Sequence, residues 1–197
     1  MQNIGDFLLT FQEPKSPYPS RTGRPWHEID LLGSARLCMT DADQAWSGFP
    51  CASFEDAQYR AWLLGESYGS ASITQVLVDP GILNGHCLLL AFEMAAQRWH
   101  LLTNRLGTLH VFYAFDGKRG ALGTFSPAVA AAANKSLLDW QSLGHFFRLG
   151  FFTGGSTYWQ GLSLVRPATH LVLDAHGRVL SEEQTWQWHH DPQTALT

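Results

Sequence analysis

The sequence predicts one α+β domain built on antiparallel sheets. Many short apolar segments have strand character and only two segments have clear helix character, a balance typical of antiparallel sheets with few helices. The 197 residues are enough for one well-filled hydrophobic core. With 45% hydrophobic and 15% charged residues, the composition is that of a globular chain. We therefore expect a single domain over residues 1–188, followed by a polar tail over 189–197.

Apolar runs broken by proline, glycine and polar clusters indicate the strands of the first half. We expect loops over 13–25, which carries four prolines, and over 41–56. Pro80 and Gly81 mark a turn. The expected strands are 6–12, 29–39, 59–64 and 71–78.

The second half has the pattern of a β-meander, in which strands alternate with short turns. Asp116-Gly117-Lys118 separates its last two strands, and Ala175-His176-Gly177 is the turn of a final hairpin over 169–174 and 178–181. The meander strands are expected over 87–93, 99–103, 108–115 and 120–125.

Two helices are expected, each from its terminal signals. Ser126 is a candidate N-cap with Pro127 at the first helical position, and Asn134 can end the alanine-rich run that follows. Asp139 begins a second helix, which Gly150 ends. An apolar stripe at helical spacing on this second helix is expected to face the core: Trp140, Leu143, Phe146 and Phe147.

Charge and composition exclude several classes of function. The net charge of −4 offers no basic footprint for nucleic acid, and no run approaches the roughly 20 apolar residues of a membrane span. The chain starts without a charged-apolar-small leader and has three cysteines, an odd number, so we expect a soluble, cytoplasmic protein with free thiols. We expect no cofactor and no metal, because phosphate-loop and G-x-S-x-G motifs are absent and His189-His190-Asp191 has the character of a solvated tail.

Eight tryptophans and twelve phenylalanines are many for this length. They either fill a bulky core or form an exposed aromatic face that a partner covers. Few charges together with many aromatic residues also favour self-association, for which a homodimer is one form.

Motifs in the order of a known family run through residues 29–188. Gly33-Ser34-Ala35-Arg36-Leu37 resembles a "G-H-x-R-L" strand, and Gly65-Glu66-Ser67-Tyr68 resembles the core of "N-G-E-I-Y-N". The C-terminal third is the closest match, where 150–167 resembles "G-x-x-x-x-x-T-x-F-x-G-I-x-x-L-x-P-G". Further matches lie at 85–93 ("G-x-F-A-F-x-x-x-D"), 104–113 ("R-D-R-x-G-x-x-P-L-Y-Y") and 138–147 ("L-D-x-x-x-L-x-x-Y-L").

Together these stretches resemble the N-terminal glutaminase domain of the asparagine synthetase family, a class II glutamine amidotransferase. The resemblance implies an Ntn-hydrolase-like fold, a four-layer αββα sandwich of two antiparallel sheets, here with a reduced helical layer. It also implies a partner, an ATP-dependent amide-forming domain, which this chain is too short to contain.

The resemblance breaks down at the residues that carry glutamine hydrolysis. The family's nucleophile is a cysteine at position 2 whose own α-amine acts as the base, and this chain has Gln2 there. Leu64 stands where the family has an asparagine that donates to the oxyanion, which leaves only the Gly65 N–H. Loss of one such donor typically costs about 2.7–4 kcal/mol of transition-state stabilisation. The Ser-Asp-x-Glu motif that binds the substrate amine is absent from residues 65–83.

Two charged positions of the family's substrate site are retained. Arg36 matches the arginine that holds the glutamine carboxylate, a bidentate task that suits a guanidinium. The alternative is a structural ion pair, for which Glu66 is the expected partner. We therefore expect no catalytic residue and a vestigial substrate-binding set: Arg36, Leu64, Gly65 and Glu66.

The expected function is that of a degenerate, glutaminase-inactive domain, a pseudoenzyme, which docks an ATP-dependent synthetase or cyclase domain or its peptide substrate. The N-terminal domains of lasso-peptide cyclases and β-lactam synthetases are similar. One open alternative is glutamine hydrolysis by Cys51 after cleavage of the preceding peptide bond, whereas Cys38 and Cys87 are expected in the core. The other is an amino-acid-binding module around Arg36 and Glu66.

Overall fold

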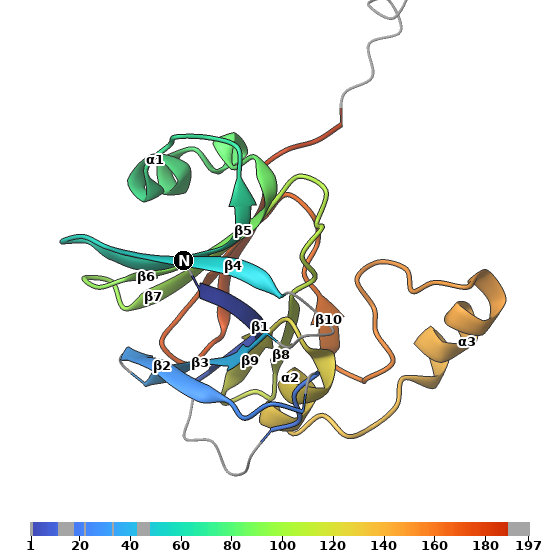
Figure 1. Ribbon diagram of the computed structural model, residues 1–197. Coiled ribbons are helices and arrows are strands. Elements are labelled where there is room, and N and C mark those ends of the chain that lie inside the picture. The colour runs from blue at the N-terminus through green and yellow to red at the C-terminus, as the bar shows by residue number, and fades with distance from the viewer. Residues whose placement is uncertain (1, 12–17, 22, 33, 43–47, 189–197) are drawn as a thin grey trace, which may run out of the picture.

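The computed structural model describes residues 2–11, 18–21, 23–32, 34–42 and 48–188, in which strands hold 43% of the residues and helices 15%. The strands pair antiparallel and join into one twelve-stranded sheet. Figure 1 shows that this sheet curls into a half-barrel. Antiparallel pairing is therefore observed, whereas the predicted αββα sandwich with two sheets between helical layers is wrong.

Strand β1 (Gln2–Thr10) explains why two separate sheets do not form. Near its start Ile4 lies opposite Phe49 of β4 (Phe49–Glu55), and near its end Leu8 lies opposite Gly123 of β9 (Gly120–Gly123). Its other edge pairs with β3 (Ala35–Asp41) from Ile4 to Thr10. A register shift after Ile4 bends β1 between its two neighbours. One strand thus belongs to both halves, so the sheet curls instead of splitting into two layers.

The sheet order is β10-β8-β9-β1-β4-β5-β6-β7-β11-β12, with β3 pairing with β1 and β2. The remaining strands are β2 (His27–Leu32), β5 (Tyr59–Ser67), β6 (Gly85–Glu93), β7 (Arg98–Thr103), β8 (Phe112–Phe115), β10 (Leu162–Leu164), β11 (Thr169–Leu173) and β12 (Val179–Gln184). The helices are α1 (Ile73–Val78), α2 (Ser126–Ala132), α3 (Trp140–Leu149) and the short 3-10 helix η1 (Pro80–Ile82). None of the described helices is long and apolar enough to cross a membrane.

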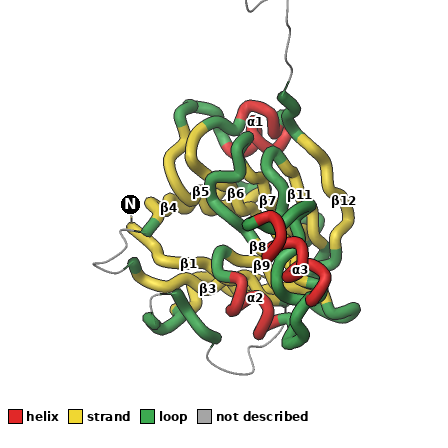
Figure 2. Tube along the Cα trace, turned by 90° about the vertical axis from the view of Figure 1, so that its right-hand side faces the viewer, coloured by secondary structure: helices red, strands yellow, loops and turns green. Residues whose placement is uncertain are grey.

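Apolar side chains sort into three clusters, because successive residues of a strand point to opposite faces. The largest cluster lies inside the curl and includes Phe7, Leu88 and Trp99. On the outer faces, Leu8 belongs to a cluster with α2, and Leu89 belongs to a cluster with α1. Figure 2 shows these two helices at opposite ends of the curl. The inner cluster therefore joins the two halves of the sheet.

The first half of the sheet differs from the sequence prediction in its strand boundaries. The single strand expected over 29–39 is a hairpin of β2 and β3, and β4 occupies part of the loop expected over 41–56. The apolar run continues on both sides of the turn at Ser34, so hydrophobicity alone does not mark the break. Strand β10 was likewise not expected.

Two local predictions are wrong, both at the start of a helix. Residues 71–78, expected as a strand, contain helix α1, which Ser72 and Gln75 begin with a capping box. Ser126 is not an N-cap but the first residue of α2, and its Oγ lies 3.1 Å from the Tyr158 hydroxyl.

The second helix is confirmed, and two further strands form with other bounds than expected: the strand predicted over 6–12 is β1, which runs from Gln2 to Thr10, and the strand predicted over 108–115 is β8, which begins only at Phe112. The Asp139 carboxylate accepts a hydrogen bond from the Ser142 N–H at 2.9 Å, and Gly150 ends α3 with φ +82°. Strands β6, β7 and β9 and the β11–β12 hairpin lie within three residues of their predicted bounds. The expected tail over 189–197, with its His189-His190-Asp191 run, lies outside the described residues.

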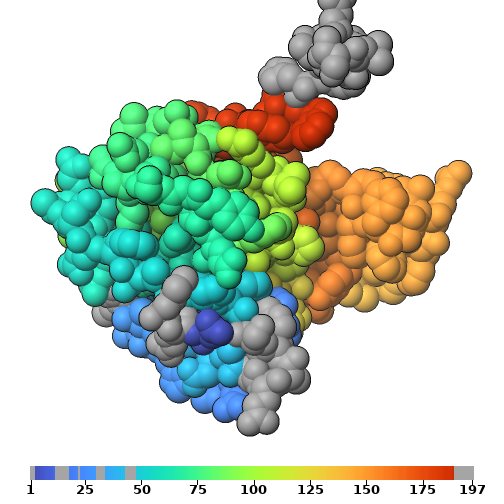
Figure 3. Space-filling view, turned by 45° about the horizontal axis from the view of Figure 1, so that its top comes forward, coloured from blue at the N-terminus to red at the C-terminus, as the bar shows by residue number. Residues whose placement is uncertain are grey.

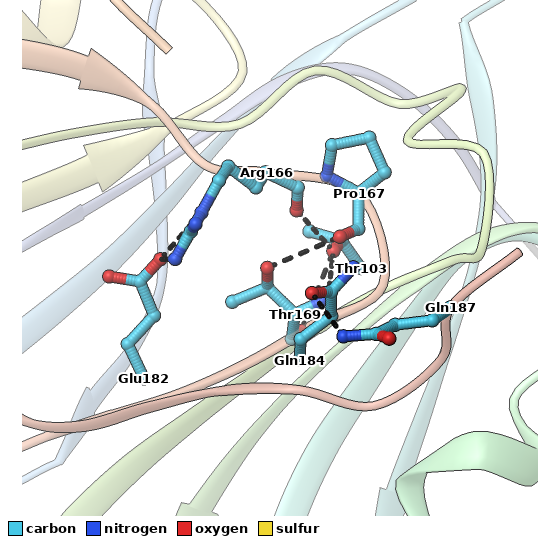
Figure 4. Close-up of polar contacts among 7 residues, drawn as sticks. All are labelled: Thr103, Arg166, Pro167, Thr169, Glu182, Gln184 and Gln187. Carbon is cyan, nitrogen blue, oxygen red and sulfur yellow. Dashed lines mark hydrogen bonds and ion pairs between the residues drawn. The ribbon is translucent and has the colours of Figure 1, made fainter. Parts of the chain in front are cut away.

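Side-chain contacts fasten the final hairpin to the rest of the sheet (Figure 4). Thr103 Oγ1 on β7 donates to the Arg166 carbonyl at 2.8 Å and accepts from the Thr169 N–H at 2.9 Å. Arg166 also forms an ion pair with Glu182 of β12 at 2.7 Å. These contacts hold the start of β11 against β7 and tie the segment before β11 to β12.

Candidate functional site

The predicted vestigial residues do not form one site. Arg36 lies on β3 and forms an ion pair with Glu28 of the neighbouring strand β2. Glu66 is exposed at the end of β5, opposite His86 in β6, and no ion pair joins it to Arg36 in the described part of the chain. The predicted Arg36–Glu66 pair is therefore wrong. Strands β1 and β4 separate β3 from β5 in the sheet order.

The two positions before Glu66 serve packing. Leu64 is fully buried in the inner cluster, so an apolar side chain fills the place of the family's asparagine. Gly65 has φ +90°, and a Cβ there would lie 2.0 Å from the His86 carbonyl oxygen. Gly65 is thus required by the close approach of β5 to β6. None of this gives the expected residues a chemical role.

Cys51 lies between two positions that the resemblance links to catalysis. Along the sheet it is opposite Gln2 on β1 and opposite Leu64 on β5. Burial raises the pKa of the Cys51 thiol to about 11, so it is protonated at neutral pH and is a weak nucleophile. Cleavage before Cys51 would also cut β4 in its middle. Cys87 is buried as predicted, and Cys38 is partly buried.

A cavity of about 760 Å³ opens beside Cys51, between β2–β3 and β4–β5. Figure 1 shows these two strand pairs facing each other across the open side of the curl. Its buried apolar wall is made of Ile4, Met39 and Trp62. The other lining residues are mostly polar or stand nearer the opening: His27, Ile29, Thr40, Asp41, Cys51, Ala52 and Ser53.

The polar pair of this cavity comes from neighbouring strands. His27 Nε2 of β2 lies 3.4 Å from Asp41 Oδ2 of β3, and each side chain is about half exposed, 52% and 50%. Both residues were outside the predicted site. The strand alternation of β3, which places Met39 and Asp41 on one face, is a sequence signal that could have identified Asp41.

A second feature is the α3 lobe, defined here as residues 137–160. Figures 1 and 3 show it projecting from the curled sheet. The aromatic stripe predicted to lie in the core is instead largely exposed, with Trp140 at 73% and Phe147 at 79%. Only Ser142 of α3 is buried. The lobe exposes large apolar side chains at Leu137, Leu138, Trp140, Phe146, Phe147, Leu149 and Phe151.

An aromatic ladder connects this lobe to the sheet. Phe146 stacks on Phe152 with ring centroids 4.9 Å apart, and Phe152 contacts Tyr158 at 6.2 Å. Tyr158 contacts Trp159, which packs against the α2 cluster. The Asp139 N–H also donates to the Tyr158 carbonyl. The helix is therefore held in place by aromatic contacts at its base while its outer face stays uncovered.

Comparison with known proteins assigns no family to this chain. No model of a protein family matches it, and no curated protein matches it significantly. Within the described residues, no group of three or more His, Cys, Asp or Glu side chains could hold a metal ion.

Proposed function

We propose that this chain is a non-catalytic docking module, a degenerate relative of the amidotransferase domains, that binds an ATP-dependent amide-forming domain of the asparagine synthetase type. The observation that carries the proposal is the exposed aromatic face of the α3 lobe. Exposed apolar patches of this kind mark interaction sites on soluble domains, since leaving them in water is unfavourable.

The lobe has the geometry of a helix that fits into a groove. Trp140 and Phe147 lie two turns apart, and Phe146 and Leu149 extend the apolar surface between and beyond them. Partners that recognise an amphipathic helix do so through a few such anchors. Tryptophan in particular dominates binding energy at many interfaces.

The charges of the lobe define the partner further. Its only charged Asp, Glu, Lys or Arg residues are Asp139 and Arg148. Asp139 is engaged as the N-cap of α3, and hydrogen bonding from Ser142 lowers its pKa. Arg148, in the last turn, has no ion-pair partner among the described residues. A matching partner surface is an apolar groove with a carboxylate at one end.

The absence of catalytic groups at the expected positions supports a docking role over glutamine hydrolysis. Position 2 is Gln2, Leu64 is buried in the core, and the Cys51 thiol has a raised pKa. A glutaminase would need an activated nucleophile and an oxyanion donor at these places.

Isothermal titration calorimetry against a synthetase-type protein encoded beside this chain, recognised by its "S-G-G-x-D-S" pyrophosphate loop, tests the proposal. The double variant Trp140→Ala/Phe147→Ala is expected to bind about 30-fold more weakly or worse. Trp188→Ala removes a tryptophan that is 75% exposed outside the lobe and serves as the matched control. Unchanged affinity of the double variant overturns the proposal. Ammonia release from glutamine that Cys51→Ala abolishes supports the hydrolase alternative instead.

A further inference from the structure

We infer that the cavity between β2–β3 and β4–β5 binds a small organic ammonium ion with an aromatic or branched apolar body, and that Asp41 is its counter-ion. This site goes beyond the docking role and does not depend on it, because none of the cavity's lining residues belongs to the α3 lobe. Either activity can therefore be lost without the other.

The apolar part of the ligand follows from the wall of the cavity. Ile4, Met39 and Trp62 line it and are each 3–4% exposed, so they are held by the inner cluster rather than free to collapse into the space. A volume of about 760 Å³ lies within the range of small-molecule sites. An indole- or phenyl-sized group fits a wall of this kind through dispersion and release of water.

The positive charge of the ligand follows from the charges around the cavity. Among the described residues that line the cavity, Asp41 is the single acidic one, and none is a lysine or arginine. Within the described residues, His27 is the only side-chain partner of the Asp41 carboxylate, and its Nε2 lies 3.4 Å away, which is long for a charge-assisted hydrogen bond. An ionised carboxylate accepts several hydrogen bonds, so an ammonium can join this pair. A carboxylate ligand would meet repulsion from Asp41 instead.

The opposite wall supplies groups that orient the ligand. Cys51 and Ser53 stand two residues apart on β4 and so project from the same face. The Ser53 hydroxyl offers both a donor and an acceptor. The Cys51 thiol is part of the cavity lining, so a bound ligand should slow its chemical labelling.

Calorimetry on the full chain with three ligands of similar shape tests the inference: 2-phenylethylamine, 3-phenylpropionate and 2-phenylethanol. The amine is expected to bind at least tenfold more tightly than the other two. Asp41→Asn, which keeps the shape of the side chain, should weaken amine binding about tenfold or more. As a control, Glu183→Gln removes an exposed negative charge on β12 and should leave the affinity for the amine unchanged. Ser53→Phe fills the cavity and should abolish binding of all three.

Alkylation of Cys51 gives a readout that does not depend on heat of binding. Iodoacetamide labelling at pH 8.5, followed by peptide mass spectrometry, is expected to slow severalfold at Cys51 when 2-phenylethylamine is present, with Cys38 labelling unchanged. Equal binding of the amine and the acid, unchanged amine affinity in Asp41→Asn, or no protection of Cys51 would each overturn the inference. Tighter binding of 3-phenylpropionate than of the amine would show that the site prefers an anion, and it would overturn the inference as well.

Discussion

His100 Nδ1 lies 3.0 Å from His170 Nε2 across strands β7 and β11. The other nitrogen of His100, Nε2, lies 3.4 Å from Glu93 Oε2. Burial lowers the pKa of both histidines, and that of His170 falls from its ordinary 6.5 to about 4. Both rings are therefore neutral at neutral pH, so that one ring nitrogen can donate to the other.

The stability of the protein should fall as pH drops from about 6.5 to about 4. In this window the unfolded chain binds a proton at His170 that the folded protein does not, so protonation favours unfolding. His170→Gln should reduce this dependence while leaving stability at pH 8 within about 1 kcal/mol. Urea unfolding at several pH values measures both. Equal pH slopes for the variant and the parent would contradict the assignment.

Arg21 and Asp6 form the next testable pair. Asp6 is fully buried, its Oδ1 lies 3.2 Å from Arg21 Nη2, and it accepts a hydrogen bond from Thr124 Oγ1 at 3.0 Å. Arg21→Ala leaves this carboxylate buried without its cation and should cost about 2–3 kcal/mol of unfolding free energy. Adding Asp6→Asn should recover part of the loss. Additive effects in the double-mutant cycle would show that the two residues are not coupled.

The same carboxylate adds a pH effect of opposite direction to that of His170. Burial raises the pKa of Asp6 above its ordinary 3.8 despite the attraction of Arg21. Its favourable contribution is complete below 3.8 and is lost as pH rises through the raised value, because the folded state holds the proton more tightly. Asp6→Asn should remove this component, measured by urea unfolding between pH 3.5 and 7. A steeper rise in stability with increasing pH in the parent than in the variant would contradict it.

Replacing Glu66 and Glu28 in turn should show which of the two carboxylates pairs with Arg36. Glu66→Gln is expected to change stability by less than about 0.5 kcal/mol, because Glu66 is exposed and has no ion pair with Arg36. Glu28→Gln breaks the ion pair that Arg36 does make and should cost up to about 1 kcal/mol. Thermal unfolding of both variants gives the comparison. A larger loss from Glu66→Gln than from Glu28→Gln would restore the pairing first expected.

Two glycine-to-alanine changes should have opposite effects. Gly65→Ala places a Cβ 2.0 Å from the His86 carbonyl oxygen at φ +90° and should cost about 3 kcal/mol or more. Gly144→Ala lies within α3, where a Cβ meets nothing within 4 Å, and should add up to about 1 kcal/mol. Urea unfolding measures the difference. A destabilised Gly144→Ala would mean that the outer face of α3 is covered in solution.

The sequence predictions were most accurate where the signals lie within the element itself. Helix α3 could be placed because Asp139 and Gly150 act within its own first and last turns. Helix α1 was missed although its signal, Ser72 with Gln75, is equally local, because residues 71–78 also carry a weak strand alternation that competes with this signal. The β2–β3 hairpin was missed because the apolar run does not stop at its turn.

Neither candidate site could be assembled from the sequence. His27 and Asp41 meet only because β2 folds back on β3, and Cys51 joins them only because β1 brings β4 to the same opening. The helical spacing of apolar residues also does not show whether other elements of the protein cover that face of the helix. The stripe of Trp140 and Phe147 has the period of a core face, and the structure leaves it in solvent.

Residue types and near neighbours were enough to predict the strand-rich, antiparallel character of the chain and the ends of α3, and they show that position 2 is not a cysteine. Three features became visible only in the folded chain: β1 joins both halves into one curled sheet, Arg36 pairs with Glu28, and α3 stands apart from the core. These outcomes depend on which distant segments pair, and strand pairing is set by packing across the whole sheet rather than by any local pattern.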